Sequence, residues 1–456
     1  MALDKVHPTL MTSMEAASET PPSNPNVGQR WFRLSTGVTY QYTNDGSSSF
    51  WLDVSSGGIG TSNYRAVNFV GDADPHPRSN IAGADVGAIY YNREGNRYFE
   101  LMDATNNANV WRGSYSVVGG TVHTYEASNV TYRIHVFWAD SLYHNVEPRA
   151  TWRTQTSHML YLDKSISADV LMVAGGGGGG GEFGGGGGGA GVLYASGRTI
   201  PAGSYIIKVG CGGRNGLHSG QQAPHRAAMM GGTTTAFGAT IYGGGPGGGR
   251  SFNWTDTASG TQNAHVRTNM ANGGGTAPNS DATAEAGTAT SSSGFVGSGG
   301  SFTTSGGYTG GQDGGDAGNY PGGGGAGAGA NGVSPGGTGS PGGNGGNGIQ
   351  VGAGIYDNVN NYWWAGGGGG GTFNTADPGG NGGNGGGGGG ASFSSGAGGS
   401  GHRGGISPGQ QSGVGNAYKG GDGGRGTGGG GGGSTHQYGI GGVGGSGIVI
   451  VKYAIN

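Results

Sequence analysis

The stretch VLMVAGGGGGGGEFGGGGGGAGVLYA, residues 170–195, decides the fold of this chain. It contains two of five glycine runs of six or more residues, and the others are at 366–371, 385–390 and 428–433. Such runs are either flexible linkers or extended helices of the polyproline-II type, whose backbones lack Cβ atoms and can pack directly on one another. Flexible linkers would make this region a tether, whereas packed helices would make it a rigid scaffold.

Three observations favour the scaffold. Aromatic residues interrupt the runs, whereas flexible linkers avoid them. Apolar, strand-like segments at Val170–Val173 and Ile448–Val451 bracket the region, and we expect them to pair with each other. The runs also have similar lengths, and six glycines at about 3.1 Å per residue make about two polyproline-II turns. Matched lengths suit helices that start and stop at common levels.

A three-residue period supports the same interpretation. A Gly-Gly-Asn pattern at residues 340–348 recurs 37 residues later at 377–385. In a helix with three residues per turn, the two glycine faces can contact neighbouring backbones while the third residue points outward or into a seam. Such a helix has no internal hydrogen bonds, so its amides must find neighbouring helices and only a bundle can be stable.

Composition divides the chain near Ala174. Glycine totals 118, of which 13 lie in residues 1–174 and therefore 105 in the remainder. We predict a mainly β and irregular fold, in which small β modules precede a polyglycine-II helix bundle bracketed by strands. The predicted parts are an arm at 1–20, β modules at 21–58 and 59–120, a β-rich connector with an entry strand at 121–174, and a glycine-rich domain at 175–456 with a closing strand at 447–454.

The N-terminal third contains a repeated pattern. Val27-Gly28 to Trp51 and Val86-Gly87 to Trp111 follow the same order of strand-like and turn-like segments, over intervals of 24 and 25 residues. This predicts two copies of a small β module. Their tryptophans are expected to form packed small cores rather than ligand-stacking surfaces. A further strand is predicted at 131–137.

Charge and composition exclude several function classes. The net charge is −3 and the sequence pI is about 6.4, without the basic stripe of a nucleic-acid-binding protein. Cys211 is the single cysteine and cannot form an intrachain disulfide. The sequence has no apolar stretch long enough to span a membrane, and its first residues lead us to expect no signal peptide. We expect neither nucleic-acid binding nor membrane insertion.

No chemical motif stands out. GxGxxG matches carry no weight in so much glycine, and no phosphate-binding loop with its lysine occurs. His135 and His144 lack a third ligand at metal spacing. The nine acidic residues of 175–456 show no distinctive carboxylate pairing. We predict no catalytic residue, no metal site and no cofactor, and we expect that the protein is not an enzyme.

Two segments carry a resemblance to known families. The string Pro25-Asn26-Val27-Gly28-Gln29-Arg30-Trp31-Phe32, with its downstream turns and Trp51, resembles small modules of phage structural proteins, notably those of cyanobacterial phages. Residues 168–453 resemble the glycine-rich domain of phage tail-fibre and adhesin proteins, through 169–174, 190–194, 200–210 and 445–453. The stretch at 211–320 is less regular than in that family.

The resemblance implies a function and partners. In the related adhesins of T-even-like phages, polyglycine helices form a rigid scaffold and the loops between them contact the host receptor. It implies a homotrimer located in the virion tail, attached to other tail proteins through the N-terminal arm. The implied partner is a host cell-surface glycan or an outer-membrane protein.

Aromatic insertions in polar, Asn-rich loops are the candidate receptor contacts, because aromatic rings offer flat surfaces and low-entropy contact area. The candidates are Phe252, Trp254, Tyr356, Tyr362, Trp363 and Trp364. The alternative is that these rings staple or cap the bundle. Two other functions stay open: a non-adhesive structural or decoration protein of the virion, and a glycan depolymerase.

Overall fold

In the computed structural model of the chain, the described residues form β-strands and irregular segments without any α-helix. The molecule is therefore mainly β, as the sequence predicts. The chain divides into two compact units, Met1–Ala66 and Val67–Asn456. The described residues are 16–27, 29–33, 38–44, 49–53, 67–72, 75, 80–92, 97–107, 109–113, 117–139, 155–162, 164–217, 228–249, 270–277, 287–288, 291–315, 320–337, 339–373, 377–393, 400–401, 404–411, 418–436 and 438–455.

The first unit contains a four-stranded sheet in the order β1-β2-β3-β4. Its strands are Ala16–Ser18, Arg30–Arg33, Val38–Asn44 and Ser49–Asp53. β1 and β2 are parallel, whereas β2-β3 and β3-β4 are antiparallel pairs. Strand β1 lies within the stretch that the sequence suggests is an arm, so Ala16–Ser18 form part of this sheet.

A second four-stranded sheet begins the second unit and repeats this design in the order β5-β6-β7-β8. Its strands are Val67–Gly71, Ile89–Asn92, Arg97–Asp103 and Val110–Gly113. Again the first pair is parallel and the other two pairs are antiparallel. Phe99, Leu101 and Trp111 form its buried core.

Two larger sheets of the second unit share one hydrophobic core. The six-stranded sheet has the order β10 (Thr121–Ala127), β11 (Val130–Trp138), β21 (Ile448–Ile455), β13 (Ile166–Val173), β14 (Val192–Ile200) and β18 (Ser301–Ser305). The five-stranded sheet has the order β17 (Ala239–Ile241), β16 (Thr234–Ala236), β15 (Gly203–Gly210), β12 (Gln155–Leu162) and β9 (Val117–Val118). A two-stranded hairpin of β19 (Ile349–Gln350) and β20 (Trp363–Trp364) completes the set.

The predicted pairing of the bracketing strands is confirmed. β13 and β21 are antiparallel neighbours, with Val170 opposite Val451 and Val173 opposite Ile448. β11 flanks β21 on its other side, which confirms the strand predicted at 131–137. All four bracketing residues are fully buried. The glycine region therefore starts and ends in the centre of one sheet.

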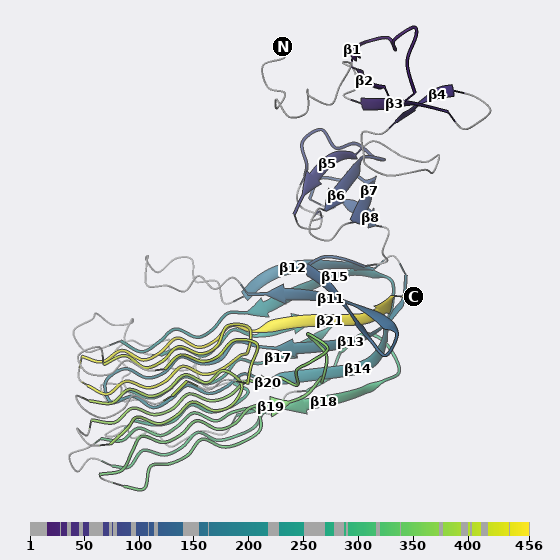
Figure 1. Cartoon of the computed structure of the whole chain (residues 1–456). Helices are drawn as coiled ribbons and strands as arrows, with labels where there is room; N and C mark the ends of the chain where they lie inside the picture. Colours follow the sequence, from purple (N-terminus) through teal and green to yellow (C-terminus); the bar gives the residue numbers. More distant parts are fainter. Residues whose placement is uncertain are drawn as a thin grey trace. The chain divides into compact units, whose positions relative to one another are not determined.

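Glycine-rich segments leave these sheets and lie side by side (Figure 1). Successive amides of Gly175–Gly180 donate to three different segments, and every third amide returns to the same segment. Their acceptors are, in order, the carbonyls of Gly232, Gly445, Gly188, Met229, Gly442 and Gly185. The carbonyls of the same residues accept, in order, from the amides of Gly244, Gly213, Gly431, Gly247, Gly216 and Ser434. This segment therefore bonds to six others.

The pure glycine runs occupy the interior of this array. The runs at 184–189, 366–371 and 428–433 also bond to segments on six sides, and the run at 385–390 bonds to five segments. A Cβ atom at Gly187 would lie 2.2 Å from the carbonyl oxygen of Gly177, and one at Gly368 would lie 2.1 Å from that of Gly431. Backbone neighbours cannot move aside as a flexible side chain can, so these positions require glycine.

Two segments on the surface, residues 342–348 and 379–385, carry a side chain at every third residue. In residues 342–348 the glycines face other segments while Asn344 and Asn347 are exposed. The Oδ1 atoms of Asn344 and Asn347 accept from the amides of Asn381 and Asn384, at 2.8 and 3.1 Å. The 37-residue sequence repeat thus corresponds to two adjacent surface segments in register. The asparagine of one supplies an acceptor to an amide of the next.

Candidate functional site

The turns at the ends of the glycine segments bring together a group of aromatic rings, here called the turn cluster. Each ring lies one to three residues before or after a glycine segment, at the end opposite the sheets. Phe183, for example, lies in the two-residue turn between the runs at 175–181 and 184–189. The turn cluster consists of Phe183, Tyr320, Phe373, Phe393, Tyr418, His436 and Tyr438.

The rings form one continuous group. The centroid of Phe183 lies 4.9 Å from that of Tyr320 and 5.2 Å from that of Phe373. Phe373 continues to Phe393 at 4.6 Å. The rings of Phe393, Tyr418 and His436 are close to parallel, with interplanar angles of 9–18° and separations of 4.6–5.7 Å. Tyr438 stands at the rim, 59% exposed and 5.4 Å from His436.

Local backbone geometry fixes these rings. Phe183, Tyr320 and Tyr418 have φ values of 56°, 44° and 40°, in the left-handed region that bulky residues rarely adopt. Isolated β-bridges join Thr372 to Ser392 and Lys419 to Ile440, so neighbouring turns are also tied to one another. Strained conformations of this kind persist only where the surroundings hold them, and they concentrate at functional sites.

The surroundings of His436 favour the neutral form of its ring. The backbone N–H of Tyr438 donates to Nδ1 of His436 at 3.2 Å, so this nitrogen carries no proton and the neutral ring has its proton on Nε2. Burial lowers the pKa of His436, which also favours the neutral ring. Beside Tyr418, Lys419 is paired with Asp422 at 3.1 Å.

Four of the six predicted contact residues come together elsewhere, on the β19-β20 hairpin. Tyr356 lies 6.0 Å from Tyr362, and Tyr362 lies 6.0 Å from Trp364, measured between ring centroids. Tyr356 also contacts His123 of β10 at 5.2 Å. The backbone N–H of Trp363 donates to the carbonyl of Gly404 at 2.8 Å. Through the contact of Tyr356 with His123, this hairpin packs on the six-stranded sheet.

The hairpin loop is held by one carboxylate. Asp357 accepts from the amides of Val359 and Asn360 and from the hydroxyl of Tyr362. Burial disfavours the charged form of Asp357, but these hydrogen bonds outweigh it and lower the pKa. Burial and the bond to Asp357 raise the pKa of Tyr362 to about 12. Val359, at the top of the loop, is 85% exposed.

The predicted contact residues thus have different surroundings. Trp364 is fully buried in the main core, and Tyr356 and Tyr362 pack against that core. Trp363 is half-buried. Phe252 and Trp254 lie outside the described residues. Receptor contact by any of the six stays a prediction.

The sequence predictions missed the turn cluster, although a signal for it exists. Three glycine runs are followed within three residues by a hydroxyl residue and then a ring, as in Thr372-Phe373, Ser392-Phe393 and Thr435-His436. Each of these rings belongs to the turn cluster. Their common position after a run of fixed length could have indicated that they meet in space.

Other kinds of site are missing from the described part of the chain. It contains no group of three His, Cys, Asp or Glu residues placed to hold a metal ion. None of its segments is a helix with the length and apolarity needed to cross a membrane. Comparison with protein-family models and with curated proteins finds no match to this chain.

Proposed function

We propose that this chain is a tail-fibre or tail-tip protein of a phage virion, and that it recognises the host cell surface through the turn cluster. The cluster is the observation that carries the proposal. It gathers aromatic rings from six turns at the end of the glycine array, away from the sheets. Aromatic side chains supply large contact area at low entropic cost and are enriched in recognition surfaces.

The scaffold in this proposal is a bundle of polyglycine-II helices. Its support is the three-residue period of the hydrogen bonds made by Gly175–Gly180, because polyproline-II-type helices have three residues per turn. Bonds to six surrounding segments satisfy the backbone groups that such a helix cannot satisfy internally. A bundle of this kind would hold the turns at fixed positions, which lowers the entropy lost on binding.

The same proposal assigns the remaining parts by resemblance. The assembly is a homotrimer, the N-terminal arm attaches it to other tail proteins, and the host partner is a cell-surface glycan or an outer-membrane protein. The N-terminal modules then separate the attachment region from the recognition surface along the chain.

Adsorption of the purified protein to host cells tests the recognition surface. Tyr438→Ala removes an exposed ring at the rim of the turn cluster, and Val359→Ala truncates the exposed top of the hairpin loop as a matched control. We expect Tyr438→Ala, combined with Tyr418→Ala, to weaken adsorption about tenfold or more, the scale of an interface hot spot. The Val359→Ala variant should adsorb like the unaltered protein.

The opposite outcomes identify the alternatives. If the turn-cluster variant adsorbs normally and the Val359→Ala variant adsorbs less, the recognition surface is the hairpin loop and not the turn cluster. Absence of adsorption by the unaltered protein, together with a position away from the tail tip in electron micrographs of particles, would indicate a structural or decoration protein. Release of products from host polysaccharide would indicate a depolymerase.

A further inference from the structure

The two small four-stranded sheets hold four side chains each at equivalent places. In each sheet, one of these residues on the second strand lies opposite one on the third strand. The residue two positions further along the third strand lies opposite the last of the four, on the fourth strand. In the first sheet these pairs are Trp31 with Tyr40 and Tyr42 with Trp51, here called the aromatic quartet. In the second sheet they are Tyr90 with Phe99 and Leu101 with Trp111. Residues opposite each other, and residues two apart on one strand, share a face.

Ring geometry confirms that the positions correspond. The ring centroids of Trp31 and Trp51 are 5.6 Å apart with an interplanar angle of 64°. Their counterparts Tyr90 and Trp111 are 5.8 Å apart with an angle of 66°. The same packing is thus built twice on the same scaffold.

The two faces nevertheless differ in chemistry and burial. In the second sheet, Phe99 and Leu101 are fully apolar and at most 1% exposed. Their face is covered by Ile81, Ala84, Ala88 and Tyr161. In the first sheet the same two positions hold Tyr40 and Tyr42, which are half-buried, as is Trp51. Where one copy has an apolar core, the other has partly exposed rings, two of them with hydroxyl groups, around Trp31, which is 5% exposed.

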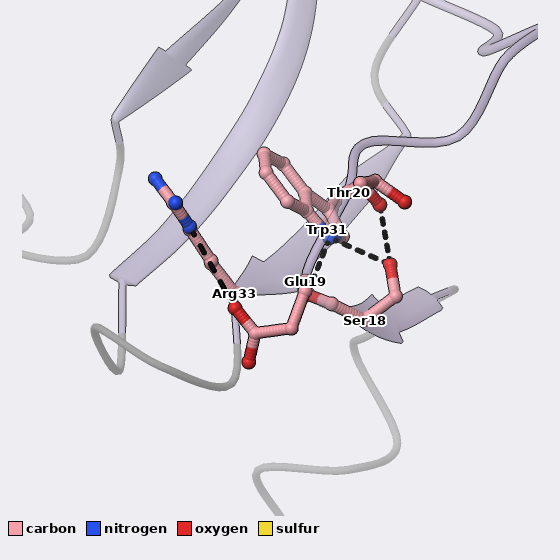
Figure 2. A network of polar contacts seen from close by, with 5 residues as sticks. All are labelled: Ser18, Glu19, Thr20, Trp31 and Arg33. Carbon is pink, nitrogen blue, oxygen red and sulfur yellow. Dashed lines mark hydrogen bonds and ion pairs between the residues drawn. The ribbon is translucent and has the colours of Figure 1, made fainter.

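The aromatic quartet is also fixed in place before any ligand arrives. The indole N–H of Trp31 donates to the carbonyl and to the hydroxyl of Ser18, at 3.2 and 3.1 Å (Figure 2). The hydroxyl of Ser18 in turn donates to the carbonyl of Thr20. Trp31 stacks on Tyr40 at 5.0 Å, and Tyr42 contacts Trp51 at 5.2 Å. A rigid aromatic surface loses little entropy on binding.

We propose that the aromatic quartet is a binding platform for a neutral saccharide. A sugar ring offers a face of C–H groups, which packs on aromatic faces, and a rim of hydroxyls, which the phenols of Tyr40 and Tyr42 can hydrogen-bond. Arg33, two residues from Trp31 on the same strand, is paired with Glu19 at 3.9 Å (Figure 2), and Asp53 lies opposite Tyr40 in the register of β3 and β4. Charged residues of both signs therefore border the quartet, which favours a ligand without net charge. This inference is independent of the turn cluster.

Calorimetric titration of the full chain with chitohexaose, cellohexaose and maltohexaose tests the platform. We expect at least one of these neutral hexasaccharides to bind. Trp51→Ala should weaken that binding about tenfold or more. The double variant Tyr40→Phe with Tyr42→Leu installs the residues of the second sheet, so it should keep the sheet folded and still lose affinity severalfold. Near-ultraviolet circular dichroism checks the fold of each variant.

Three results would overturn the proposal. The first is that none of the three hexasaccharides binds the unaltered chain. The second is that a saccharide binds equally well to the folded double variant. The third is that Trp51→Ala changes the sedimentation coefficient of the protein without changing saccharide affinity, which would make the quartet a subunit contact. Asn344→Ala, on a surface segment of the glycine array and outside both proposed sites, should leave saccharide affinity unchanged and serves as the control.

Discussion

The paired sheets and the glycine array of the second unit both depend on backbone hydrogen bonds, but they fill their interiors in opposite ways. A strand such as β21 bonds to two neighbours in a plane and buries side chains above and below it. A glycine segment such as 175–181 bonds to six neighbours and buries no side chain. The sheets are therefore sensitive to the removal of atoms, whereas the array is sensitive to their addition.

The largest expected effect is in the sheets. Ile450, fully buried in the central strand β21, should lose about 2–5 kcal/mol of stability on replacement by alanine, because the cavity cannot fully close. Chemical denaturation monitored by circular dichroism measures this loss. A loss of stability below about 1 kcal/mol would show that the core around Ile450 repacks freely, which a close-packed interior does not do.

Adding one methyl group should damage the array nearly as much. In Gly368→Ala the new Cβ would lie 2.1 Å from the carbonyl oxygen of Gly431, and neither backbone can move without breaking bonds to its other neighbours. We expect a loss of about 3 kcal/mol, the upper end for overpacking. Alanine restricts the unfolded chain and would by itself stabilise the protein by about 0.4–1 kcal/mol. A measured gain in stability would contradict the interior position of this run.

A surface residue of the array provides the contrast. Asn344→Ala removes the acceptor for the amide of Asn381 but creates no clash, so the expected loss is about 1 kcal/mol or less. Asn344→Asp keeps an acceptor oxygen and should lose less than Asn344→Ala. Thermal unfolding of the two variants, compared with Gly368→Ala, measures the difference between outward and inward positions. Equal losses of stability in Asn344→Ala and Gly368→Ala would contradict the distinction between outward and inward positions of the array.

The smallest expected effect is at the end of the array and depends on pH. Burial lowers the pKa of His436 in the folded protein below its ordinary value of 6.5. The unfolded chain then binds the proton more tightly, so the free energy of unfolding should fall as pH drops below about 6.5 and until the folded pKa is passed. His436→Phe keeps a stacking ring and should reduce this dependence. Parallel stability profiles of the two proteins between pH 7 and pH 5 would contradict the assignment.

Much of the sheet architecture was predictable because side-chain patterns encode it. The apolar bracketing segments predict their own pairing, since burial of Val170 and Val451 demands a partner. The order of strand-like and turn-like segments from Val27-Gly28 to Trp51 predicts the antiparallel strands of the first sheet. Strand β1 was missed because a three-residue strand of Ala and Ser carries no such pattern.

The arrangement of the glycine segments is encoded differently. A run of glycine reveals that neighbours surround it, but it has no side chain to indicate which segments those neighbours are. The exceptions are informative: Asn344 and Asn381 mark adjacent surface segments through their 37-residue offset. The turn cluster depends on which turns meet, so its rings could be identified singly but not as a group. Tyr356 and Trp364 were chosen for their polar, Asn-rich sequence surroundings, and the structure places them against the core.

The central place of β21 has a consequence for the order of folding. This strand follows every other described element in the chain, yet it lies between β11 and β13. Ribosomal synthesis must therefore deliver residue 455 before the six-stranded sheet can close, and until then the edges of β11 and β13 lack their partner. Contacts over such long sequence separations form slowly and expose unpaired edges to aggregation. Production of this protein should accordingly depend on assistance, from a chaperone or from slow synthesis at low temperature, more than its final stability suggests.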